Sequence, residues 1–140
     1  MAENKTKPTK VSVAAFLKKA AKGQQLKDSQ ELVKLFTELT GKPAKMWGPS
    51  IVGFGSYHYV YDSGREGDAP LVAFSPRKPK LVLYVTSCLD DEAWRPKLGK
   101  FQASTGGCVY IKALDDIDRG ELKRVAAASI AALRKRYPPK

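Results

Sequence analysis

Cysteine and histidine are scarce in this chain of 140 residues, which holds two cysteines, Cys88 and Cys108, and one histidine, His58. Two cysteines are too few for a disulfide scaffold, and unpaired thiols fit a reducing compartment. Neither cysteine belongs to a Cys-x-x-Cys pair, so the ligand spacing of a zinc site is missing. A lone histidine cannot build a histidine-based metal site, and we expect His58 to have a structural or surface role.

Long hydrophobic runs are also missing. No apolar stretch approaches the ~20 residues that a membrane-spanning helix needs. The first ten residues are charged and lead into no apolar stretch with a cleavage site, which argues against a secretory signal. We therefore expect a cytoplasmic protein without a membrane partner. The length suits one domain over residues 11–137, preceded by a disordered basic arm, 1–10, and followed by a short tail, 138–140.

Acidic residues are rare at both ends of the chain, although the net charge is +11. Residues 1–27 hold seven lysines against one acid, and residues 134–140 hold four cations and no acid. The segment between them is nearly neutral, with 14 basic and 13 acidic residues. The excess charge favours solubility and the capping of helix ends, and it leaves open an association of the basic termini with nucleic acid or an acidic partner.

Three amphipathic helices are predicted from caps and apolar spacing. Ser12 is a candidate cap for a short first helix that Gly23 ends. Asp28, with a glutamate three residues later, predicts the start of a second helix that ends at Gly41. Asp118 begins the last helix in the same way, and its apolar stripe extends to residue 137.

Strands are predicted between the second and the last helix. Alternation places Tyr57 and Tyr59 on one face of a strand, and the polar residues 63–68 after it are predicted to form a loop. Short connections favour an antiparallel sheet. The fold class is therefore α+β, a two-layer sandwich in which N- and C-terminal helices cover one face of a mainly antiparallel sheet of about five strands. The predicted strands are Ile51–Phe54, Ser56–Asp62, Leu71–Phe74, Lys80–Val85 and Cys108–Ile111.

Several separated motifs form a second kind of signal. They are Thr40-Gly41-Lys42, Met46-Trp47-Gly48-Pro49-Ser50-Ile51-Val52-Gly53-Phe54-Gly55, Tyr61-Asp62-Ser63-Gly64-Arg65-Glu66-Gly67, Phe74-Ser75-Pro76-Arg77-Lys78, Leu98-Gly99-Lys100, Cys108-Val109-Tyr110-Ile111-Lys112 and Leu114-Asp115-Asp116-Ile117-Asp118. Together they resemble the signature of the YdhG-like family, a family of domains of unknown function, over roughly residues 12–130. The chain has Cys108-Val109 where the family more often has Cys-Leu.

The resemblance implies a frataxin-like fold, with terminal helices on an antiparallel sheet. Some relatives carry an iron-chaperone label, so iron binding is an alternative function. A frataxin-type iron surface would need an acidic ridge. The acidic runs at residues 90–92 and 115–118 instead precede predicted helix starts, where carboxylates cap free N–H groups. We therefore predict no cofactor and no metal ligands.

Catalytic motifs are missing as well. Cys108 has no partner base in a recognisable motif, and Gly53-Phe54-Gly55 is better explained by tight backbone turning than by phosphate binding. The sequence therefore gives no reason to predict an enzyme.

Aromatic and basic residues are close together in the middle of the chain. Aromatic rings offer flat contact area and guanidinium groups bind phosphate or carboxylate, although alternating tyrosines also suit a half-buried strand. We predict a non-enzymatic binding or accessory module with a shallow site for a small anion or a protein partner. The predicted site residues are Trp47, Tyr57, Tyr59, Arg65, Arg77 and Lys78.

Overall fold

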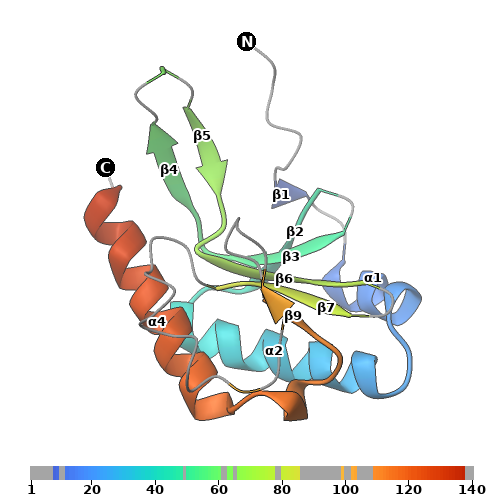
Figure 1. Ribbon diagram of the computed structural model, residues 1–140. Coiled ribbons are helices and arrows are strands. Elements are labelled where there is room, and N and C mark those ends of the chain that lie inside the picture. Colours follow the sequence, from blue (N-terminus) through green and yellow to red (C-terminus); the bar gives the residue numbers. More distant parts are fainter. Residues whose placement is uncertain are drawn as a thin grey trace.

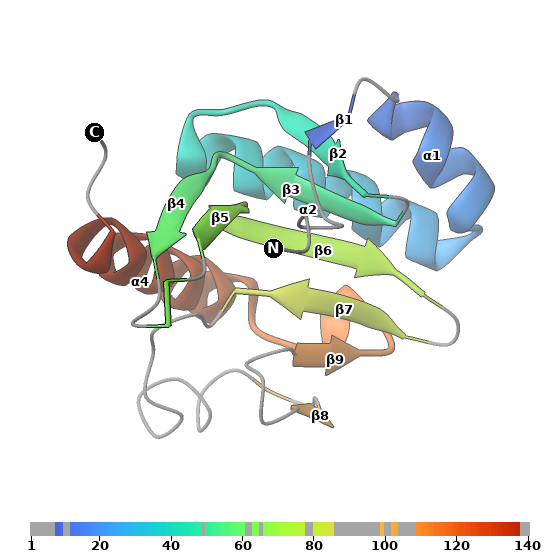
Figure 2. The same ribbon diagram turned by 90° about the horizontal axis from the view of Figure 1, so that it is seen from above.

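An antiparallel sheet forms the centre of the fold. The computed structural model describes residues 8–9, 12–48, 50–60, 63–64, 66–77, 80–85, 99, 102–103 and 109–137. Neighbouring strands pair in the order β1-β2-β3-β6-β7-β9-β8, and every pair is antiparallel (Figure 2). The strands are β1 (Pro8–Thr9), β2 (Ala44–Trp47), β3 (Ile51–Phe54), β6 (Val72–Pro76), β7 (Leu81–Tyr84), β8 (Gln102–Ala103) and β9 (Val109–Ile111).

Helices cover one face of this sheet, which confirms the predicted α+β class (Figure 1). They are α1 (Val13–Ala20), α2 (Gln24–Thr40) and α4 (Arg119–Arg136), with a short 3-10 helix, η1 (Leu114–Asp116), before α4. Within the described residues, five strands of the sheet have three residues or more, in agreement with the predicted number. No helix in that part of the chain is both long and apolar enough to cross a membrane.

Two helix starts and one helix end follow the predicted caps. The Ser12 hydroxyl accepts a hydrogen bond from the N–H of Ala15 at 3.2 Å, and the Asp118 carboxylate accepts one from the N–H of Glu121 at 2.9 Å. Gly41 ends α2 in the left-handed conformation, with φ of 67°. That conformation is costly for residues with a Cβ atom, so the glycine explains where the helix stops.

The predicted start of the second helix at Asp28 is wrong. α2 begins four residues earlier, after Gly23, and Asp28 is a buried residue inside it, with 1% of its surface exposed. Its carboxylate accepts hydrogen bonds from the backbone N–H of Leu114 at 3.0 Å and from the side chain of Gln24 at 2.7 Å. Asp28 therefore does not cap its own helix. It accepts a hydrogen bond from η1, 86 residues away in the sequence.

Glu31, expected beside Asp28 in a capping pair, pairs instead with Arg119 at the start of α4. Arg119 also donates to Asp115 at 2.8 Å. The hydrogen bonds that Arg119 donates to Glu31 first, and then to Asp115, raise the pKa of Arg119 above its ordinary value. The arginine therefore joins α2, η1 and α4 at the end of the molecule where the last helix begins.

Three phenylalanines connect the helical layer to the middle of the sheet. The ring of Phe36 on α2 lies 5.4 Å from that of Phe54 on β3, edge to face, and 6.4 Å from that of Phe74 on β6. All three side chains are fully buried. Such aromatic contacts add to the free energy gained by burying the rings. Alternation along the strands then sends the intervening side chains to the opposite face.

The opposite face of the sheet is also buried at its centre. Because side chains alternate along each strand, four residues at the centre of the sheet point to this face, and each is at most 3% exposed. They are Trp47, Ala73, Ser75 and Val82. Ser75 donates a hydrogen bond to the carbonyl of Ser50 at 2.6 Å, which satisfies its buried hydroxyl. At these positions the second face of the sheet is therefore closed to water.

A two-stranded ribbon, β4 (Tyr57–Val60) with β5 (Glu66–Ala69), leaves the main sheet and projects from the face opposite the helices (Figure 1). This corrects two predictions, because Ser56–Asp62 is not a strand of the main sheet and part of the expected loop 63–68 is β5. Gly55 turns the chain with φ of 66°, and the N–H of Leu71 donates to the carbonyl of Phe54 at 3.1 Å where the ribbon closes. Alternation identifies a strand but not its partner.

Three further strands lie outside the sequence prediction. β2 and β8 are not predicted. β1 lies in the segment expected to be a disordered arm, where Pro8 and Thr9 pair with Trp47 and Met46. The other residues of that arm, residues 138–140 and both cysteines are outside the described residues.

Replacement of Asp28 by alanine tests its tertiary role. We expect Asp28→Ala to lower the free energy of unfolding by about 1–3 kcal/mol, because the buried N–H of Leu114 loses its acceptor. Urea unfolding measures this. The control is Glu38→Ala on the exposed side of α2, which should change stability by less than about 0.5 kcal/mol. Equal effects of the two variants would contradict the assigned role.

Candidate functional site

The predicted site residues do not all come together. Trp47 on β2 and Tyr57 on β4 line one cleft of about 1070 Å³. Tyr59 is adjacent in β4 but is buried, with 8% of its surface exposed, and it is not among the residues that line the cleft. Arg65 and Lys78 lie outside the described residues.

Arg77 belongs to a different part of the molecule and does not line the cleft. It follows β6, where its guanidinium donates to the hydroxyls of Ser75 and Tyr84, each at 3.4 Å. Its carbonyl accepts a hydrogen bond from the side chain of Gln25 at 2.8 Å. Nearness in sequence suggested that Arg77 and the tyrosines share a site, but Arg77 lies beyond the far end of β6 from the ribbon.

Three parts of the fold form the cleft. One is the ribbon, another is the outward face of β2 and β3, and the third is the last turn of α4, which reaches the ribbon (Figure 1). The chain therefore combines residues about 90 positions apart in one surface. The lining residues used below are Lys42, Lys45, Trp47, Gly53, Tyr57, His58, Asp68, Arg134, Arg136 and Tyr137.

The floor of the cleft depends on a glycine. A Cβ atom at Gly53 would lie 2.6 Å from the indole nitrogen of Trp47 and 2.8 Å from Cβ of Pro70, both closer than van der Waals contact allows. The missing side chain leaves room for the indole of Trp47, which is 2% exposed. Trp47 is thus a buried residue at the floor of the cleft, and its predicted role in ligand binding stays a prediction.

Aromatic stacking connects the ribbon to the end of α4. The rings of Tyr57 and Tyr137 lie 5.4 Å apart with planes inclined by 25°. The guanidinium carbon of Arg136 lies 5.6 Å from the centre of the Tyr137 ring, within the range of a cation–π contact. This stack fixes the separation of two walls of the cleft.

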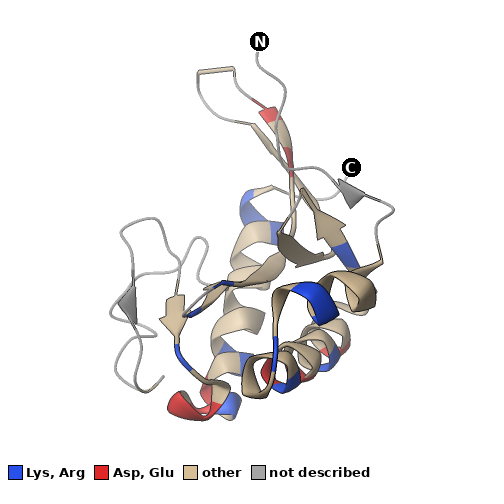
Figure 3. Cartoon of the chain, turned by 90° about the vertical axis from the view of Figure 1, so that its right-hand side faces the viewer, with Lys and Arg blue, Asp and Glu red and all other residues tan. Residues whose placement is uncertain are grey.

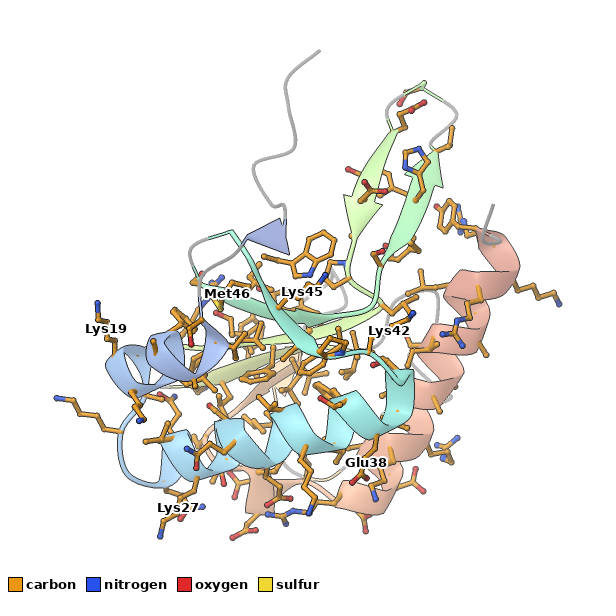
Figure 4. The ribbon with its side chains drawn as sticks, turned by 180° about the vertical axis from the view of Figure 1, so that it is seen from behind. Lys19, Lys27, Glu38, Lys42, Lys45 and Met46 are labelled. Carbon is orange, nitrogen blue, oxygen red and sulfur yellow. The ribbon has the colours of Figure 1, made fainter. Side chains whose placement is uncertain are left out.

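Positive charge dominates the lining. Lys42 and Lys45 come from the segment that follows α2, where Figure 4 shows them between the end of that helix and the base of the ribbon. Arg134 and Arg136 come from the last turn of α4. Among the described residues, no carboxylate forms an ion pair with Lys42, Lys45 or Arg134.

Helix ends reduce this charge but do not cancel it. α2 and α4 both end at the cleft, and each C-terminus contributes roughly half a negative charge. Among the residues that the structure describes, Asp68 is the one acidic residue of the lining. Four cations against one carboxylate and two helix ends leave about two net positive charges. The negative charge of the helix ends therefore offsets part of the charge of these cations, and a net positive charge remains in the cleft.

His58 lies between two carboxylates on the neighbouring strand. Its Nδ1 is 3.0 Å from an oxygen of Asp68, and its Nε2 is 3.4 Å from an oxygen of Glu66. Because the carboxylates contact opposite ring nitrogens, the three side chains do not converge on one point where a metal ion would sit. This arrangement suits the structural role expected for His58.

The acidic positions do not form one ridge. Figure 3 shows them apart from each other, on the ribbon and around η1 at the other end of the molecule. Asp118 caps α4 and Asp115 pairs with Arg119. Within the described residues, no group of three histidine, cysteine or acidic side chains could hold a metal ion, and the acidic run at 90–92 lies outside those residues.

Comparisons with known proteins identify no relative. No family model matches the chain, and neither the curated proteins nor the solved structures contain a significant match. The resemblance to the YdhG-like family therefore stays a prediction from the motifs, and the arguments below rest on the geometry of the cleft.

Sequence reasoning missed the cations that line the cleft. The sequence analysis assigns Arg134 and Arg136 to a basic C-terminal segment, and it uses Lys42 only as part of the Thr40-Gly41-Lys42 motif. A signal was present in Tyr137, which continues the apolar stripe of the last helix beyond its basic residues. It indicates that the end of α4 packs against something, but not that the ribbon is its partner.

A double-mutant cycle tests the floor. We expect Gly53→Ala to lower the free energy of unfolding by about 1–3 kcal/mol, because the added Cβ atom displaces the indole of Trp47. In a Trp47→Ala background the same change should cost at least about 1 kcal/mol less. Urea unfolding of the four proteins gives the coupling. An equal cost in both backgrounds would show that the indole does not restrict this position.

Proposed function

We propose that this protein is a binding module for an anionic ligand, which binds in the cleft between the ribbon, β2 and the last turn of α4. The observation that carries the proposal is the charge of the lining, four cations from two separate elements against one carboxylate. Cations held close together repel one another, so an anion that neutralises them is favoured there.

The chemistry of the walls supports binding as the activity. Lysine and arginine donate charge-assisted hydrogen bonds to phosphate or carboxylate groups. The partly exposed rings of Tyr57 and Tyr137 provide apolar contact area beside those cations. The Tyr57–Tyr137 stack holds two walls in place before a ligand arrives, which reduces the entropy lost on binding. The ligand is an anion, as predicted from the sequence. The cations proposed to bind it lie at the end of α4 and after the end of α2, and Arg77 is not one of them.

The iron-binding alternative receives less support. Its ligands would be carboxylates in an acidic cluster, whereas the cleft carries an excess of positive charge and the described acids serve caps and ion pairs. We therefore retain the anion-binding function and treat the family label as a separate prediction.

Titration with tripolyphosphate, followed by amide resonances of the ¹⁵N-labelled protein, tests the proposal. We expect shifts confined to residues 42–47, 53–60 and 134–137, which approach or line the cleft. Lys45→Gln and Arg134→Gln should each weaken binding by about two- to fivefold, the loss expected for one partly exposed ion pair.

Lys135→Gln and Arg77→Gln are the matched controls. Lys135 has the same charge and lies in the same turn as Arg134, but it does not line the cleft. Arg77 is a cation at the other end of β6. Both variants should bind tripolyphosphate within twofold of the unaltered protein. Equal losses in the controls and the cleft variants would reduce the effect to overall charge and contradict the proposal.

A further inference from the structure

The positions of the cations in the cleft restrict the ligand further. Lys42 and Lys45 belong to one wall, whereas Arg134 and Arg136 belong to another that is contributed by the far end of the chain. A single phosphate group occupies a small part of a cleft of about 1070 Å³. A ligand that contacts both pairs of cations must therefore be extended and carry several separated negative charges.

The aromatic residues add a second requirement. Tyr57 and Tyr137 form a partly exposed stack at the end of α4. A chain of phosphates alone would leave this surface in contact with water. Flat rings that extend the stack would cover it, since base-to-aromatic stacking depends only on the presence of a π-face.

We propose that the ligand is single-stranded nucleic acid, with its phosphates between the two cationic walls and a base against the Tyr57–Tyr137 stack. This inference rests on the proposed anion-binding function and names its ligand class. Repeated phosphates meet the first requirement and bases meet the second. A duplex meets only the first, because its base faces are already stacked on each other and cannot reach Tyr57.

This site differs from the nucleic-acid association expected for the basic termini. Arg134 and Arg136 belong to the C-terminal basic segment, but the fold holds them in an ordered helical turn beside aromatic rings. Residues 1–10 contribute none of the described lining residues of the cleft. Deletion of residues 1–7 therefore separates the two possibilities, because it removes lysines of the arm and leaves the cleft unchanged.

Fluorescence anisotropy with a labelled twelve-nucleotide oligothymidylate tests the inference on the full chain. Four cations predict a slope of about −3 for the logarithm of the binding constant against the logarithm of salt concentration. The double variant Arg134→Gln/Arg136→Gln should bring the slope to about −1.5. Lys135→Gln and deletion of residues 1–7 should leave the affinity within about threefold.

Competition by unlabelled ligands separates the contribution of base stacking to the affinity from the contribution of negative charge. We expect the oligothymidylate, and an RNA strand of the same length, to bind about tenfold more tightly than inorganic polyphosphate of equal charge or a DNA duplex. Tyr57→Leu should bring the ratio of the oligothymidylate and polyphosphate affinities close to one, because the loss of the stack weakens both ligands but removes base stacking only from the first. Tyr57→Phe should retain the ratio because the ring remains.

The outcomes distinguish the two proposals. Equal or tighter binding of polyphosphate, or of the duplex, would overturn the nucleic-acid inference while the anion-binding function stands. Loss of binding on deletion of residues 1–7, or an equal loss in Lys135→Gln, would assign the affinity to charge outside the cleft and overturn the inference. If neither tripolyphosphate nor the oligonucleotide binds, both proposals fail.

Discussion

The contact of Phe36 with Phe54 and Phe74 determines which face of the sheet meets the helices. The three rings lie 5.4 to 6.4 Å apart and are fully buried, so α2 is fixed over β3 and β6. Because side chains alternate along a strand, burying these rings on one face places Lys45 and Trp47 on the other. The surface opposite the helices is therefore a consequence of how the core is packed.

The cleft forms where the chain leaves that second face. Gly55 adopts a left-handed conformation and turns the backbone out of β3, which starts the ribbon. The ribbon leaves the sheet plane and meets the end of α4, and the Tyr57–Tyr137 stack holds it there. The ends of both long helices bring cations to the same place, in excess over the negative charge of the helix ends and of Asp68. The cationic lining of the cleft thus results from where two helices end.

Short sequence patterns predicted the helix caps correctly where the cap contacts residues that are close in the sequence. Ser12, Gly41 and Asp118 act through atoms within four residues, and the structure confirms all three. Asp28 has the same residue type and a similar setting, yet its partner is the N–H of Leu114. The strand at Tyr57 was predicted from alternation, but alternation does not state whether the next strand is β5 or a strand of the main sheet.

The sequence by itself determined the α+β class, the antiparallel pairing, the caps and the presence of aromatic and basic residues suited to an anion, since composition and periodicity act over a few residues. The tertiary structure decided which of those residues share a site. It separated Arg77 from Tyr57 and brought Tyr137 against Tyr57, 80 positions away in the sequence. The physical reason is that a cleft depends on the directions in which distant elements end. Those directions follow from packing against a common core, which no short stretch of sequence contains.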